Sequence, residues 1–192
     1  MSQEETSPIQ VNISPKISAK DAITIDNLKF YLTNFSLVKS GETVWKETNS
    51  YHLIDISKPS SLSFNLATKI DFDEIHFSLG TDSLTNISGA MGGDLDPTKG
   101  MYWAWNSGYI NFKLEGKSKS TSLEFHLGGY APPYQTVQKI KLKTTKNDLT
   151  IFLNVSEFLN QIDLTKQHKI MSPGKEAQRL SKILSTLFYV NE

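Results

Sequence analysis

The sequence predicts a mainly β, sandwich-like single domain with a C-terminal α-helix. Short runs of alternating apolar and polar residues recur along most of the 192-residue chain, with turn-forming residues between them. Helical periodicity is clear only near the C-terminal end. Short strands between turns, followed by one amphipathic helix, are typical of a β-sandwich or barrel. No internal boundary is evident, so one domain is expected over 1–192.

The N-terminal half supplies most of the predicted strands. Residues 1–8 are polar and are expected to be disordered. The first alternating segment, 9–17, contains Pro15, which has no N–H for a β-ladder, so an edge strand is predicted there. A hairpin turn is predicted at 39–42. The remaining strands expected in this half share alternation with one apolar face, and they are 23–38, 44–45, 51–56, 63–70 and 74–79.

The C-terminal half is predicted to hold two hairpins and the helix. One hairpin joins 109–115 to 123–127 through the solvated tip 117–122. A second joins 137–142 to 149–155. The helix is predicted over about 172–187, because Ser172-Pro173 supplies a cap and a first-turn proline before apolar residues spaced three to four apart.

Composition excludes several classes of function. Twenty basic residues balance twenty acidic ones, so no net field would draw the protein to nucleic acid or an anionic membrane. Cysteine is absent, which removes disulfides and thiolate chemistry. No apolar run approaches the roughly 18 residues of a membrane span. No nucleophile, base and orienting group occur together, so the chain is not expected to be an enzyme.

The central stretch 89–130 carries the candidate binding residues. Trp103 and Trp105 lie two apart and would share one face of an extended segment. His126 lies in a predicted strand and is either a hydrogen-bonded core histidine or a metal ligand. The indoles are either core residues or part of that site. Asp94 and Asp96 offer oxygens at the alternation of calcium loops, although an Asx-turn explains them equally well.

A second set of candidate ligands lies just before the predicted helix. His168 and Met171 form a histidine–methionine pair, and copper(I) favours imidazole nitrogen and thioether sulfur. The alternative is a surface histidine beside a core methionine. His52 and His76 lie in alternating strands and are interpreted as structural.

The chain resembles the MbnP-like family, whose members are exported copper-binding proteins associated with methanobactin genes. The resemblance covers nearly the whole chain. It is carried by IDNLKFYLTNFSLV (25–38), YHLIDI (51–56), FSLGTDSLTNISGAMGGDLDPTKGMYWAWNSGYINFKLEG (77–116), EFHLGGY (124–130) and MSPGKEAQRL (171–180).

The resemblance implies a copper site built from a histidine and a tryptophan oxidised to kynurenine by a partner di-haem peroxidase-like protein. On this chain these would be His126 and one of Trp103 or Trp105, with His168, Met101 or Met171 completing the ligands. Some copper-binding relatives carry a histidine two residues after the modified tryptophan, where this chain has Trp105 or Ser107.

The sequence therefore indicates an exported, non-catalytic copper-binding or copper-trafficking protein. We expect it in the periplasm or at the cell surface, with a lipid anchor on a cysteine upstream of residue 1. The alternative is an interaction module that keeps the fold without copper. A calcium-stabilised structural domain that uses Asp94 and Asp96 is a third interpretation, compatible with either of the other two.

Overall fold

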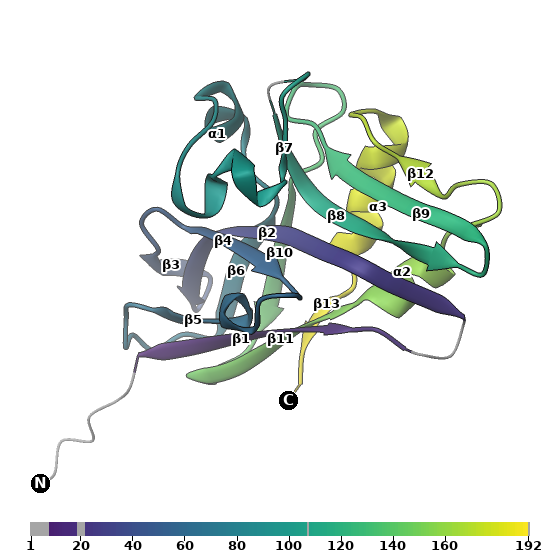
Figure 1. Ribbon diagram of the computed structural model, residues 1–192. Helices are drawn as coiled ribbons and strands as arrows, with labels where there is room; N and C mark the ends of the chain where they lie inside the picture. The colour runs from purple at the N-terminus through teal and green to yellow at the C-terminus, as the bar shows by residue number, and fades with distance from the viewer. Residues whose placement is uncertain (1–7, 19–21, 107, 192) are drawn as a thin grey trace, which may run out of the picture.

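The computed structural model describes residues 8–18, 22–106 and 108–191. Two mixed β-sheets face each other, and the larger one curls into a half-barrel around the core (Figure 1). The prediction of a mainly β fold with a C-terminal helix is confirmed. The single-domain assignment stays a prediction. Disorder was predicted for 1–8, and 1–7 of that range lie outside the described residues.

The smaller sheet has the strand order β13-β11-β1-β5. β1 runs parallel to β11, and the other two pairs are antiparallel. The edge-strand prediction for β1 is wrong over 10–12, which pairs with both β11 and β5. Pro15 lies beyond the last β5 pair, so its missing N–H removes no bond on that side. The bounds are Ile9–Lys16 (β1), Ser63–Leu66 (β5), Asp148–Asn154 (β11) and Phe188–Val190 (β13).

The larger sheet is organised around the long strand β2, Ile23–Lys39. β8 pairs with the first half of β2 and β6 with the second half, so the sheet forks and curls at this point. The order is β10-β6-β2-β8-β9-β12, with β3 and β4 on the other side of β2 and β7 on β8. The bounds are Glu42–Lys46 (β3), Tyr51–Asp55 (β4), Glu74–Leu79 (β6), Tyr102–Trp103 (β7), Gly108–Ser118 (β8), Thr121–Gly128 (β9), Gln138–Lys143 (β10) and Lys169–Ile170 (β12).

Two of the predicted hairpins form and one does not. β2 and β3 meet at a tight turn with Ser40 and Gly41 both at positive φ, and β8 and β9 meet at the predicted tip. The hairpin predicted between 137–142 and 149–155 is wrong. β10 belongs to the larger sheet and β11 to the smaller one, because their apolar faces cover the core from opposite sides.

The helices are short, and α3 packs against β9 and β10. α1 is Ser83–Ile87, α2 is Val155–Asn160 and α3 is Lys175–Ser185. α3 begins later than predicted, because Pro173 packs against Gly129 and Gly174 becomes the N-cap. It also ends before Leu187, where the chain turns into β13. None of the helices in the described part of the chain is long and apolar enough to cross a membrane.

Apolar side chains divide into two clusters on opposite faces of the larger sheet. The main core fills the space between the sheets and is closed by α3 through Ala177, Leu180 and Leu184. The second cluster lies on the outer face of β2 and β8, under the 93–103 segment. Its buried members are Tyr31, Leu53, Leu95, Met101, Trp103, Tyr109 and Ile110. This outer cluster fixes the segment that carries the tryptophans.

Candidate metal centre

His126 lies on the outer face of β9. Its neighbours Phe125 and Leu127 point into the main core, so strand alternation turns the imidazole outward. The residue is nevertheless only 6% exposed, because surrounding side chains cover it. His126 is therefore a buried histidine outside the apolar core.

Glu115 is the partner of His126. Their Oε1 and Nε2 atoms are 2.7 Å apart. In the β8–β9 ladder Glu115 lies opposite Glu124, which makes His126 its diagonal neighbour two residues along. The carboxylate also accepts a 2.8 Å hydrogen bond from Asn27 and lies 3.4 Å from Lys113 Nζ. It is thus held in place from two adjacent strands.

The electrostatics of this pair leave the imidazole neutral and the carboxylate charged. Burial lowers the pKa of His126, and the hydrogen bond to Glu115 offsets only part of that effect. Burial by itself raises the pKa of Glu115, but the hydrogen bonds from Asn27 and His126 and the charge of Lys113 outweigh it and hold that pKa below its usual range.

The pairing fixes the tautomer of His126. An ionised carboxylate only accepts hydrogen bonds, so Nε2 carries the proton and donates it to Glu115. Nδ1 keeps its lone pair and has no partner in the described part of the chain. His126 Nδ1 also has some access to solvent. Among the described residues, the fully buried side-chain nitrogen or oxygen without a hydrogen-bond partner is His168 Nδ1, and His126 Nδ1 is not in that class. His126 Nδ1 is therefore free to bind a ligand.

Trp103 lies over β9 on the same face as His126. Its indole covers Gly128, where an added Cβ would stand 2.7 Å from Trp103 Cζ3. Residues i and i+2 of a strand share a face about 7 Å apart, so the indole stands beside the position of the imidazole. Trp103 is only 6% exposed and packs with Met101 in the outer cluster.

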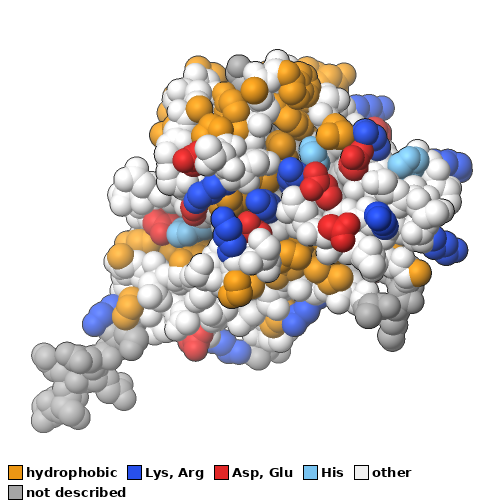
Figure 2. Space-filling model, viewed as in Figure 1, with side chains coloured by type: hydrophobic (Ala, Val, Ile, Leu, Met, Phe, Trp, Pro, Cys, Tyr) orange, Lys and Arg blue, Asp and Glu red, His pale blue; other side chains and the backbone are white. Residues whose placement is uncertain are grey.

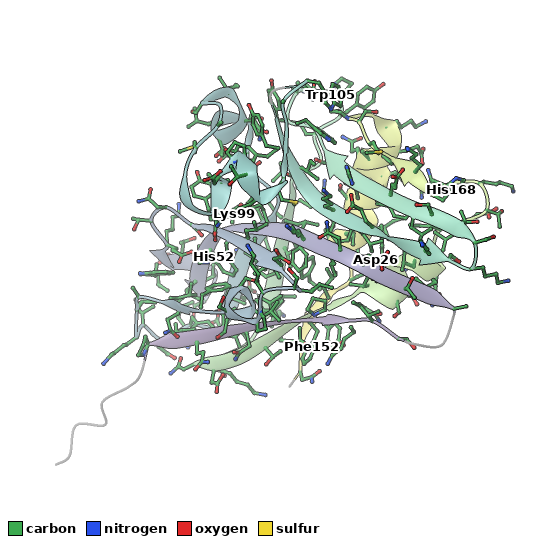
Figure 3. All side chains as sticks on the ribbon, in the orientation of Figure 1. Asp26, His52, Lys99, Trp105, Phe152 and His168 are labelled. Atoms are coloured by element: carbon green, nitrogen blue, oxygen red, sulfur yellow. The ribbon has the colours of Figure 1, made fainter. Side chains whose placement is uncertain are left out.

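Trp105 occupies a different environment from Trp103. The prediction that both indoles share one face of an extended segment is wrong, because the chain turns after Trp103 to enter β8. Trp105 is 66% exposed at the tip of this turn (Figure 3). The two rings remain in contact, with centroids 5.6 Å apart. Trp105 thus links the buried indole to the surface.

The other predicted copper ligands differ in their placement. Met101 is fully buried in the outer cluster with Trp103. His168 lies at the start of β12, apart from Trp105 in Figure 3, and its buried Nδ1 lacks a partner. Met171 follows β12 and is 36% exposed. This segment contacts β9 at Glu124, whose N–H donates to the His168 carbonyl at 2.8 Å and whose carboxylate lies 2.6 Å from Lys169 Nζ.

The structure gives no support to the calcium loop. Asp94 is held by Lys99 at 2.7 Å and by the backbone N–H of Leu53 at 3.0 Å. Asp96 accepts bonds from the N–H and hydroxyl of Thr98, which is the Asx-turn alternative. Both carboxylates are therefore engaged by the protein's own donors.

Sequence reasoning missed Glu115 and Gly128. The signal for Glu115 was present in the β8–β9 hairpin, because pairing Ser118 with Thr121 at the tip sets Glu115 diagonal to His126. Nothing in the sequence indicated that an indole from a separate turn would cover Gly128. Among the described residues, no three His, Asp or Glu side chains form a metal-binding group.

The model of the MbnP family matches residues 3–172. The chain belongs to the MbnP family. This membership implies a methanobactin-associated, copper-related function. No curated protein sequence matches the chain.

Among solved structures, the fold is similar to that of MbnP from Methylosinus trichosporium. The TM-score is 0.58 at 15% sequence identity, over 82% of this chain and 78% of that one. At this identity the likeness supports the fold rather than any individual site residue.

Proposed function

We propose that this MbnP-family protein binds copper(I) through His126 Nδ1 and a modified Trp103. The observation that carries the proposal is the placement of the Trp103 ring over Gly128, on the face of β9 that holds His126. Of the two tryptophans suggested by the family resemblance, Trp103 is the one whose ring meets the Gly128 position, two residues along β9 from His126.

The residues fit copper(I) only in part before modification. His126 supplies one neutral nitrogen donor, and Glu115 holds the ring by its other nitrogen as in carboxylate–histidine–metal arrangements. An indole N–H is a donor only and cannot ligate a metal. Conversion of Trp103 to kynurenine would cleave the Cγ–Cδ1 bond, make Cγ a carbonyl and release Cδ1 as formate after hydrolysis, with peroxide turned over by the di-haem partner as the oxidant. It would leave an aniline nitrogen with a lone pair. Met101 packs beside Trp103 and offers a thioether, a ligand that suits copper(I).

The oxidising partner would reach Trp103 through Trp105. Hydrophobic side chains gather at the end of the molecule that bears α1 and β7 (Figure 2). Leu84, Ile87 and Trp105 are the most exposed of the large apolar residues, and exposed apolar patches of this kind mark protein interaction sites. The partner is the di-haem peroxidase-like protein implied by the family resemblance. Contact between the two indoles provides a route for the oxidising equivalent from the surface to the buried ring.

The protein would act outside the cytoplasm and without catalysis of its own. Its place would be the periplasm or the cell surface, with a lipid anchor on an upstream cysteine. There it would hold or pass on copper. These statements rest on family membership and on the donor set, and the following experiment tests the copper-binding part.

The first experiment is a copper(I) titration against a chromophoric chelator, on protein made alone and on protein co-expressed with the di-haem partner. Intact mass and peptide mapping report the modified tryptophan. Trp103→Phe is expected to abolish modification and tight binding. Trp105→Phe should slow modification without preventing it, and His126→Ala should keep the modification and lose the affinity.

Two results would contradict the proposal. One is a modified tryptophan other than Trp103. The other is unchanged copper affinity in His126→Ala. Absence of binding after verified modification would favour the alternative, an interaction module that uses the exposed apolar end without metal.

A further inference from the structure

A second hollow lies on the opposite wing of the larger sheet and contains none of the candidate copper ligands. It is a groove of about 650 Å³ across the outer face of β3, β2, β6 and β10. Ligand sites commonly have volumes of about 300–1,000 Å³. The β-bulge at Asn34, which has φ 56°, bends β2 at this point and deepens the groove.

Strand register places basic and polar side chains in one row across the groove. Lys46 of β3 pairs with Ser36, Ser36 pairs with His76, and His76 pairs with Lys141. Paired residues project from the same face, so this row crosses all four strands. Lys139 lies on the same face of β10, two residues before Lys141 and opposite Ser78 of β6.

The charges of this row are unbalanced. Lys46, Lys139 and Lys141 are exposed, and none of them forms an ion pair in the described part of the chain. The two carboxylates that line the groove are occupied elsewhere. Glu47 bonds to His52 at 2.8 Å, and Asp82 caps α1 through the N–H of Thr85. The groove lining therefore carries three lysines against two carboxylates, which leaves an excess of positive charge although the whole chain is neutral.

Hydroxyl donors lie between the lysines. Neither the Ser36 nor the Ser78 hydroxyl bonds to another group among the described residues, and both line the groove. Edge strands carry lysines to prevent aggregation, which would explain Lys46 and Lys141. That role does not explain a hollow with unused hydroxyls between lysines on its two rim strands, β3 and β10.

We propose that this groove binds a small organic anion with two or more carboxylate groups. Adjacent strands lie about 4.8 Å apart, and Lys46 and Lys141 are separated by three strand spacings. Their Cα atoms are therefore about 14 Å from one another. An anion with one carboxylate is too short to contact lysines on both rims. A polycarboxylate can accept from lysines on both sides while Ser36 and Ser78 donate to its centre.

The test is calorimetric titration of the metal-free protein with citrate at low ionic strength, with acetate at the same ionic strength for comparison. Wild type is expected to bind citrate one-to-one and acetate much more weakly. Lys46→Gln with Lys141→Gln should weaken citrate binding about tenfold or more, because two charge-assisted contacts are lost.

The matched control is Lys117→Gln with Lys143→Gln. It removes the same charge, and Lys143 lies on β10 outside the groove. Citrate affinity should be retained in this control. Equal weakening in both double variants, or acetate binding as tightly as citrate, would reduce the effect to net charge and overturn the proposal.

Amide chemical shifts locate the bound citrate. Shifts centred on Ser36, His76 and Ser78 are expected, and shifts centred on another surface would overturn the assignment. Ser36→Ala keeps every charge and should weaken binding about three- to tenfold by removing one donor. No affinity for citrate in wild type would also overturn the proposal. None of these measurements involves copper, so they are independent of the proposed metal site.

Discussion

At the scale of single residues, the outer face of β9 is set by contacts between neighbours two residues apart. Glu115 holds His126 Nε2, and Trp103 fills the space above Gly128. Each contact brings together two of β7, β8 and β9, so the face depends on the β8–β9 register and on the turn between β7 and β8. Substitutions at Glu115 and at Gly128 test the contact with His126 and the contact with Trp103 separately.

Replacing Glu115 by Gln is expected to lower copper(I) affinity about 10- to 100-fold in protein whose tryptophan has been modified, because the amide no longer fixes the imidazole tautomer. Chelator competition measures the change. Glu124→Gln is the control, since Glu124 is a strand neighbour that pairs with Lys169 instead. A loss of the same size in both variants would mean that charge, rather than orientation of His126, is responsible.

Gly128→Ala is expected to destabilise the fold by about 1–3 kcal/mol, because the added methyl overlaps Trp103 Cζ3 and Tyr109 O. Urea unfolding gives the free energy, and tryptophan fluorescence reports displacement of the indole. Gly92→Ala is the control, because no atom lies within 4 Å of its Cβ position. Unchanged stability and fluorescence in Gly128→Ala would contradict the placement of Trp103.

At the scale of elements, the fork of the larger sheet decides where the tryptophan turn lies. β6 and β8 leave β2 side by side, and Asn111 fills the space between them as the bulged residue of β8. Its amide oxygen accepts from the N–H of Thr81, and its amide nitrogen donates to the Thr136 hydroxyl at 2.9 Å. This buried residue thus ties three segments together in β8, just after the tryptophan turn.

Asn111→Ala is expected to cost about 2–4 kcal/mol, because it leaves the buried N–H of Thr81 without its acceptor and removes the hydrogen bond to the Thr136 hydroxyl, which then keeps only its bond to the Gly129 carbonyl. Chemical denaturation measures the loss. Asn65→Ala on β5 is the exposed control and should change stability by less than about 0.5 kcal/mol. Equal small effects at the two sites would show that the network does not support the fork.

At the scale of the whole molecule, Lys29 fastens the tryptophan-bearing segment 93–103 to the half-barrel, and its ion pair with Asp55 holds it in place. Lys29 of β2 lies 3.3 Å from Asp55 of β4 and also donates to the carbonyl of Lys99 at 3.1 Å. Asp55 is only 2% exposed. Although burial raises its pKa, hydrogen bonds from Ser57 and the charge of Lys29 outweigh burial and leave that pKa below the ordinary value.

This lowered pKa makes stability depend on acid. A carboxyl with a depressed folded-state pKa stabilises the fold above its unfolded-state pKa of about 3.9 and loses that contribution as pH falls through the folded value. Asp55→Asn is therefore expected to be less stable than wild type at pH 7 by about 1–3 kcal/mol, and the difference should shrink below about pH 4. Thermal unfolding from pH 7 to pH 3 measures it. A difference that stays constant over this range would contradict the assignment.

The sequence by itself determined the fold class, the family and the residues from which a site could be built. Period-two alternation gave most of the strands, since it is a local property of a sheet with one buried face. The position of the β8–β9 turn also determined that Glu115 lies diagonal to His126, although seeing this requires the strands to be paired residue by residue from the turn.

Only the tertiary structure decided which of these residues lie together. Local pattern predicted a β10–β11 hairpin, yet the two strands belong to different sheets, because each must bury its apolar face from its own side of the core. The pattern likewise predicted that Trp103 and Trp105 share one face. The turn into β8 instead leaves Trp103 buried and Trp105 exposed. Contacts across the fold, such as Trp103 over Gly128, depend on how the sheets curl, and that curl follows from the β2 fork rather than from any single segment.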